Sequence, residues 1–223
     1  MVMQFDQLYK PKQFGAFKTN GMNTAVILQQ TMDYNRSIPA TILFITTYKQ
    51  TKVPDYLWQA EYDKTLSNTI CAHGGRVMQA MPDKLIALFG SQDMSQQNAV
   101  HQAITAALAM VDQISTTNEY RLAAGRPVIR LGIGISTGIA ALEQTSKGLQ
   151  LAHFSDNHLL GLAQQLSNLN QQTPFPTAFI SDETYHALLA HNHWHVENLG
   201  RVWLPEYPEA QTIHAVMRRP QFQ

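Results

Sequence analysis

The segment from Ile129 to Ala140, IRLGIGISTGIA, constrains the fold more than any other part of the chain. Its β-branched and apolar residues favour a buried strand. Glycine weakens a strand unless something has to approach the backbone closely, so Gly132, Gly134 and Gly138 predict that another element packs directly on this segment. We therefore expect residues 129–140 to form a central strand with a close-packed neighbour.

A hairpin is predicted just upstream, because two short apolar runs flank a pair of turn-forming residues. Val77 to Met81 and Leu85 to Phe89 are the expected strands, and Pro82-Asp83 suits the centre of a type I turn. Ala40 to Thr47, rich in β-branched and apolar residues, is expected to form another buried strand.

Three helices are predicted by apolar residues at helical spacing. The first, Asp55 to His73, ends at a glycine pair and carries on one face Trp58, Tyr62, Leu66 and Ile70. The second, Asn98 to Ser115, has an apolar stripe that we expect to be core: Val100, Ala103, Ile104, Ala107, Leu108, Val111 and Ile114. The third is defined by Leu159, Leu160, Ala163, Leu166 and Leu169. The remaining expected elements are a strand at 177–180, a helix from Ser181 to about Ala190, and strands at 196–202 and 211–217.

This order of elements predicts an α+β fold with a ferredoxin-like βαββαβ core and additional helices and strands. Residues 1–38 are polar and are expected to form an arm or linker, with one short helix candidate at 24–33. Residues 39–217 are expected to form the folded domain, and 218–223 a short tail.

Composition excludes several classes of protein. The formal net charge is zero and only 14% of residues are charged, which argues against nucleic acid as a partner. No apolar run approaches the roughly 18 residues of a membrane span, so direct membrane insertion is not expected. The single cysteine, Cys71, fits a reducing compartment and is expected to be buried. We expect a cytoplasmic protein, or the cytoplasmic portion of a larger membrane protein.

Several segments occur in an order and spacing that resemble a known family. They are LFITTY, HGGRVMQAMPDKLIALFG, AITAALAM, IRLGIGISTGIA, ISDETY and EAQTIHAV. Together they resemble the catalytic domain of class III adenylate and guanylate cyclases, over about Pro39 to Met217. The resemblance implies a cyclase-homology domain whose active site lies between two subunits.

The same resemblance implies a metal site that this sequence does not complete. In the family, one aspartate on the first strand and one in the hairpin turn hold two magnesium ions, which need hard oxygen ligands. The turn aspartate corresponds to Asp83, but the first-strand aspartate corresponds to Thr46. Turn geometry alone also explains an aspartate after proline.

The nucleotide-binding positions of the family are also changed. The base-selecting residue before the turn corresponds to Gln79, and its partner falls near Phe154. The catalytic asparagine and arginine correspond to Gly161 and Gln165, so the positive charge that stabilises the transition state is missing. A basic turn near the C-terminus is replaced by LPEYPE, residues 204–209, whose two glutamates would repel a triphosphate.

We therefore predict a catalytically inactive cyclase-like domain that serves as a dimerisation or regulatory module in bacterial-type signal transduction. One alternative is a receptor that keeps the interfacial cleft for a nucleotide or another small molecule. A second is a divergent cyclase, a phosphorus–oxygen lyase. No cofactor is expected, and Mg²⁺ or Mn²⁺ would be needed only for residual activity. The expected partner is a second copy or another cyclase-like domain, with a sensor domain of a larger protein as a further candidate.

Two other groups of residues have a functional and a structural interpretation. The histidines at 186, 191, 193 and 195 are ligand-type residues, but their spacing favours surface residues over a zinc site. The aromatic side chains of Tyr56, Trp58 and Tyr62 are candidates for the dimer face implied by the resemblance, or for core packing.

Overall fold

The computed structural model describes residues 35–49, 56–91, 93–145, 148–151, 158–173, 177–188 and 194–219 of the 223-residue chain. All of them belong to one compact unit. The helix expected at 24–33 lies outside the described residues.

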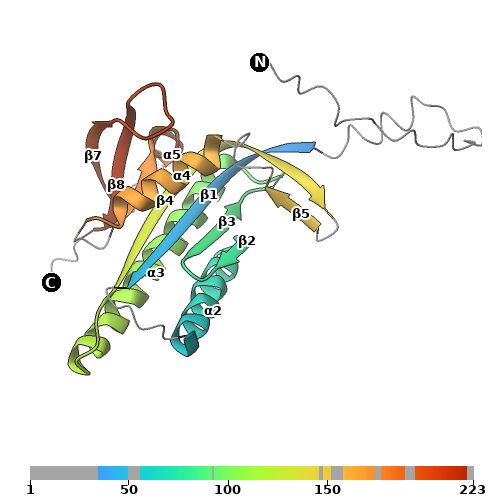
Figure 1. The fold of residues 1–223 in the computed structure, drawn as a ribbon. Coiled ribbons are helices and arrows are strands. Elements are labelled where there is room, and N and C mark those ends of the chain that lie inside the picture. The colour runs from blue at the N-terminus through green and yellow to red at the C-terminus, as the bar shows by residue number, and fades with distance from the viewer. Residues whose placement is uncertain are drawn as a thin grey trace, which may run out of the picture. The chain divides into compact units, whose positions relative to one another are not determined.

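A single mixed sheet forms the centre of this unit (Figure 1). Its strands are β1 (Asn35–Lys49), β2 (Arg76–Met81), β3 (Lys84–Phe89), β4 (Ile129–Thr145), β5 (Gly148–Leu151), β6 (Ala178–Ser181), β7 (Trp194–Val202) and β8 (Gln211–Arg218). They lie in the order β2-β3-β1-β4-β6-β8-β7, and β5 pairs with the end of β4. Only β4 and β6 pair in parallel; the other pairs are antiparallel. As predicted, β4 is central.

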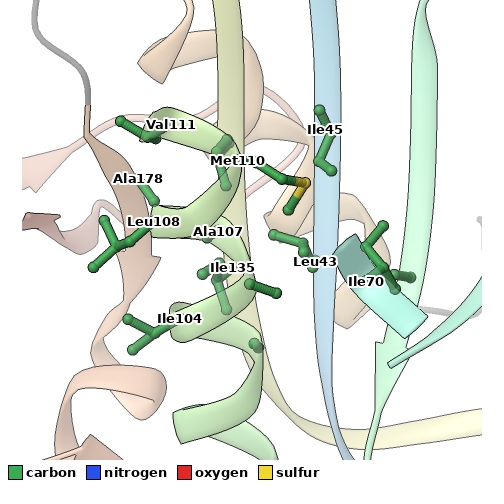
Figure 2. Close-up of a cluster of buried hydrophobic side chains, with 14 of the residues drawn as sticks. Leu43, Ile45, Ile70, Ile104, Ala107, Leu108, Met110, Val111, Ile135 and Ala178 are labelled. Atoms are coloured by element: carbon green, nitrogen blue, oxygen red, sulfur yellow. The ribbon is translucent and has the colours of Figure 1, made fainter. Parts of the chain in front are cut away.

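The described helices cover both faces of the sheet. They are α2 (Tyr56–Ala72), α3 (Gln96–Ala123), α4 (His158–Asn170) and α5 (Asp182–Leu188). Side chains of β1 alternate between the two faces: Leu43 and Ile45 join a core with α2, α3 and α5, whereas Ile42 and Phe44 join a core with α4. Figure 2 shows Leu43 and Ile45 facing Met110 of α3. The α+β fold class predicted from the sequence is confirmed.

The glycines of β4 give α4 room to lie directly on the sheet. A Cβ atom at Gly134 would overlap the backbone carbonyl of Ala163, and one at Gly132 would overlap that of Ser167. Both carbonyls belong to α4, so the close neighbour predicted from the sequence is this helix. At Gly138, in contrast, a Cβ would approach only the flexible end of the Leu159 side chain, at 3.3 Å.

Helix α2 ends at the glycine pair as predicted. Gly74 has φ of +81°, and the amide of Gly75 donates to the carbonyl of Ile70 at 2.9 Å, which closes the last turn. Tyr62, Leu66 and Ile70 are buried. The prediction for Cys71 is wrong: it is exposed, because it follows Ile70 by one residue and lies about 100° around the helix from that buried face.

Helix α3 is longer than the 98–115 that its apolar stripe predicts. Its N-cap is Ser95, whose Oγ accepts from the amide of Asn98, and all seven residues of the stripe are buried. Beyond residue 115 the helix continues because Asn118 pairs with the backbone of Ile129 on β4, accepting from its amide and donating to its carbonyl, both at 2.8 Å. Arg121 donates to the carbonyl of Pro127 at 2.7 Å.

The end of β4 also differs from the prediction. The strand runs to Thr145 rather than Ala140 and forms a hairpin with β5, which the sequence pattern did not indicate. The helix expected from Ser181 is present as α5, described from Asp182 to Leu188. Among the helices described, none is long and apolar enough to span a membrane.

We predict that Gly134→Ala destabilises the fold because the new methyl group overlaps the backbone of α4. The free energy of unfolding should fall by about 3 kcal/mol or more in a urea titration monitored by circular dichroism. Gly138→Ala on the same strand is the matched control and should change it by less than about 1 kcal/mol. Equal stability of the two variants would contradict the packing described above.

Candidate functional site

The residues that the cyclase resemblance singles out lie where the end of β1, the β2–β3 turn and helix α4 meet. The amide of Thr47 donates to the carbonyl of Asp83 at 2.9 Å, which holds the hairpin turn against β1. Thr46 is paired in register with Lys84, the residue after the turn. The fold thus brings Thr46 and the turn aspartate close together.

Thr46 is buried, with only 5% of its surface exposed, and its hydroxyl is hydrogen-bonded within the protein. Its Oγ1 lies 2.9 Å from Oγ of Ser167 on α4, and Ser167 in turn donates to the carbonyl of Gly132 at 3.0 Å. Because a hydroxyl carries one proton, Thr46 is the donor to Ser167. The result is a neutral chain of hydrogen bonds from β1 to α4 to β4.

The hairpin residues are exposed. The Asp83 carboxylate makes no hydrogen bond or ion pair with any other described residue, and no positive φ occurs at Pro82 or Asp83, as expected for a type I turn. Gln79 follows a register shift in β2 and places its Nε2 3.7 Å from the sulfur of Met81. Neither the Asp83 nor the Gln79 side chain is held in place by several polar partners among the described residues.

On α4, the two positions of the family's asparagine and arginine are one helical turn apart and half-buried. At Gly161, a Cβ atom would lie 3.2 Å from the hydroxyl of Tyr207. The Tyr207 side chain therefore stands beside the space that any longer side chain at 161 would need. Gln165 is neutral and has no hydrogen bond to another described residue.

Tyr207 is anchored to the first residue of α4. Its hydroxyl donates to the carbonyl of His158 at 2.9 Å, and the two rings pack edge to face at 4.7 Å. Burial, together with the nearby Glu206 carboxylate, raises the Tyr207 pKa to about 12. The β7–β8 segment thus closes over the N-terminal end of α4.

A tight turn presents this tyrosine. The amide of Tyr207 bonds to the carbonyl of Leu204 at 3.2 Å, with Pro205 and Glu206 between them. Glu206 has φ of +71°, the left-handed conformation that usually needs glycine or asparagine. The sequence analysis noted the two glutamates of this segment but missed Tyr207 and Ser167. Within this segment, Pro205 was the sequence signal that indicated a turn.

The described residues do not fit a two-magnesium centre. No group of three or more histidine, cysteine, aspartate or glutamate side chains lies close enough there to hold a metal ion. Asp83 is a single carboxylate, and the threonine opposite it is already bonded to Ser167. Phe154, the candidate partner for a base, lies outside the described residues.

The structure describes two of the four histidines that the sequence analysis expects at the surface. His186 is exposed and lies 3.4 Å from the Asp182 carboxylate, and His195 is exposed on β7. His191 and His193 lie outside the described residues. His214, which the sequence analysis did not single out, is buried, with its Nε2 2.9 Å from Oδ1 of Asp182.

The aromatic side chains suggested for a dimer face are only partly described. Tyr62 is buried in the core, so its role there is packing, and burial raises the pKa of its phenol. Of the two interpretations given for this residue, the structure supports core packing, because Tyr62 belongs to the core between α2 and the sheet. The side chains of Tyr56 and Trp58 lie outside those that the structure describes.

Several solved structures of nucleotidyl cyclases have the same fold. The adenylyl cyclase CyaB from P. aeruginosa superposes with a TM-score of 0.72 at 15% identity, covering 84% of this chain and 97% of that one. A guanylyl cyclase superposes at 0.67 with 20% identity, covering 85% and 98%. The guanylate cyclase domain of RhGC from Catenaria anguillulae, in complex with GTP, superposes at 0.66 with 14% identity, covering 83% and 100%.

Sequence comparison gives a weaker likeness in the same direction. Adenylate cyclase 1 of Rhizobium meliloti is 26% identical over 112 residues, which are 50% of this chain and 17% of that protein. The match therefore spans only a small part of that relative. No protein-family profile matches the sequence. The chain has the fold of nucleotidyl cyclase catalytic domains, as its resemblance to class III cyclases predicts.

We predict that Thr46→Asp destabilises the domain more than Thr46→Val. Thr46→Val removes the hydrogen bond to Ser167, which should lower the free energy of unfolding by about 1 kcal/mol. It leaves Ser167 bonded to the carbonyl of Gly132. Aspartate takes a carboxylate out of water, and because its cross-strand neighbour Lys84 offsets only part of the lost hydration, this change should cost about 3 kcal/mol. Urea denaturation in EDTA measures both values. An aspartate variant as stable as the parent would show that the position accepts a carboxylate.

We also predict that Tyr207→Phe lowers the free energy of unfolding by about 1 kcal/mol, through loss of the bond to His158. Because the tyrosine pKa is raised from 10.0 to about 12 on folding, its contribution is complete below pH 10 and is lost between pH 10 and 12. The difference in the free energy of unfolding between the parent and Tyr207→Phe should therefore become smaller between pH 10 and pH 12. Tyr120→Phe, at an exposed residue, is the control and should show neither effect.

Proposed function

We propose that the chain is a cyclase-fold domain without cyclase activity that acts as a dimerisation and regulatory module in signal transduction. The observation that carries the proposal is Thr46. It is neutral, buried and bonded to Ser167, at the strand position where the resemblance implies a metal-binding aspartate. A threonine hydroxyl that already donates to the protein is a poor substitute for an anionic magnesium ligand.

The arrangement around α4 supports the same proposal. Phosphate chemistry of the cyclase type needs positive charge near the transferring group. Gln165 is neutral, and the space beside Gly161 faces the anchored Tyr207. The Glu206 carboxylate next to Tyr207 adds negative charge where a polyphosphate would need cations.

A complementary role in a heterodimer is also disfavoured. In the family, one subunit supplies both aspartates and the other supplies the asparagine, the arginine and the base-selecting residues. This chain has Asp83 from the first set and neither Asn nor Arg at 161 and 165. Neither half of a shared active site is complete.

Dimerisation is proposed from the resemblance and from an exposed apolar residue on the sheet. Ile139 lies in the middle of β4, opposite Pro39 of β1, and 63% of its surface is exposed. A partner that packs on this part of the sheet would remove the Ile139 side chain from water, which is favourable. The occupant proposed here is a second copy or another cyclase-like domain.

We predict that the purified chain forms no cyclic AMP or cyclic GMP from ATP or GTP with Mg²⁺ or Mn²⁺. Calorimetric titration with either nucleotide and Mn²⁺ should give no heat of binding, because the cation and phosphate ligands are incomplete. Sedimentation at micromolar concentration should show dimers. Asp83→Ala is the matched variant and should behave like the parent in all three measurements.

The outcomes that contradict the proposal are distinct. Turnover that Asp83→Ala abolishes would establish a divergent cyclase. Heat of nucleotide binding without turnover would favour a nucleotide receptor. If the chain is still a monomer at about 100 times the protein concentration used in the assay, the proposal that it dimerises is contradicted.

A further inference from the structure

A cavity of about 610 Å³ lies between α3 and the strands β6, β7 and β8, apart from the site described above. Its lining residues are Leu108, Val111, Asp112, Ser115, Thr173, Thr177, Phe179, Glu197, Leu199, Ala215, Met217 and Arg218. None of these is a residue that the cyclase resemblance singles out. The volume falls in the range of about 300–1,000 Å³ that is usual for small-molecule sites.

The cavity exists because the sheet is interrupted beside β6. This strand has four residues and pairs with β4 only at Gly134–Phe179 and Ile135–Ile180. One residue earlier on β4, the amide of Ile133 donates to the side chain of Asn170 at 2.8 Å instead of to a strand. The first residues of β4 therefore pair with β1 on one side, and no described strand pairs with them on the other side, next to β6.

The walls of the cavity are apolar. Leu108 and Val111 point away from the side of α3 that carries Met110 and faces β1 (Figure 2). On the strand side the cavity is lined by Phe179, Ala215 and Met217, which also pack in the apolar cluster that contains Leu162 and Leu166 of α4. Leu199, which is 41% exposed, lies at the rim.

The charges at the rim leave one carboxylate without a counter-ion. Nε of Arg218 donates to Oδ2 of Asp112 at 2.7 Å, so these two charges compensate each other. Glu197 stands opposite Ala215 in the β7–β8 register and forms no ion pair with any residue that the structure describes. A negatively charged ligand would meet this carboxylate, and a positively charged one would be attracted to it.

We propose that this cavity binds a small molecule with an apolar body and a cationic amine, with the apolar part between Leu108, Val111 and Phe179 and the amine at Glu197. The proposal does not depend on the absence of cyclase activity, since the cavity shares no residue with the cyclase-like site.

Three probes with the same apolar body and different head groups test this: phenylbutylamine, phenylbutanol and phenylbutyrate. Binding to the full chain is measured by nitrogen-15 NMR titration, which also locates the site. Phenylbutylamine should shift the amides of β7, β8 and α3 and bind about fivefold more tightly than the alcohol, as expected for one solvent-exposed ion pair. The carboxylate should bind most weakly.

Two kinds of variant test the contribution of the Glu197 charge separately from that of the apolar cavity. Glu197→Gln should reduce the affinity for the amine to that for the alcohol, whereas Glu183→Gln on exposed α5 should change nothing. Ala215→Phe should fill the space and abolish binding of all three probes, with an unchanged fold checked by circular dichroism. If Ala215→Phe does not fold, Leu199→Asp at the rim tests the apolar contribution instead. Equal binding of amine and carboxylate, shifts confined to other elements, or no binding of the amine would overturn the proposal.

Discussion

Helix α4 lies so close to β4 that its backbone occupies the space where side chains at 132 and 134 would stand. This contact fixes the height of the helix above the sheet, and therefore the position of every residue that α4 presents to β1. Ser167 reaches both Thr46 and Gly132 only because of that closeness. The close contact thus joins two hydroxyl groups and a backbone carbonyl from three different elements.

The neutral character of this region is a property of several elements at once. β1 contributes a threonine, α4 a glycine and a glutamine, and the β7–β8 segment a tyrosine bonded to the start of the helix. Each group except the Gln165 side chain has a packing or hydrogen-bonding partner among the described residues. Thr46 and Ser167 are buried, so a charge introduced at either position would lose water that the neutral hydrogen bonds do not replace.

The sequence predicted most elements and the class of fold, because the hairpin, the α2 glycine cap and the apolar stripe of α3 are encoded by near neighbours. The glycines of β4 predicted a close-packed element without naming it. The features that the sequence did not predict depend mostly on residues that lie far apart in the chain. The extension of α3 rests on Asn118 bonding to Ile129, and Thr46 finds its partner 121 residues away. Cys71 was misplaced because one residue of helical rotation separates the buried face from solvent.

That exposed thiol gives the molecule a useful experimental handle. The chain contains one cysteine, and it lies near the end of α2, three residues before the glycine that closes the helix. A fluorophore or spin label that reacts with thiols will therefore attach at a single defined point on the unmodified protein. In an assembly of two copies, the two labels would report the separation of their α2 helices directly, with no need to remove other cysteines first.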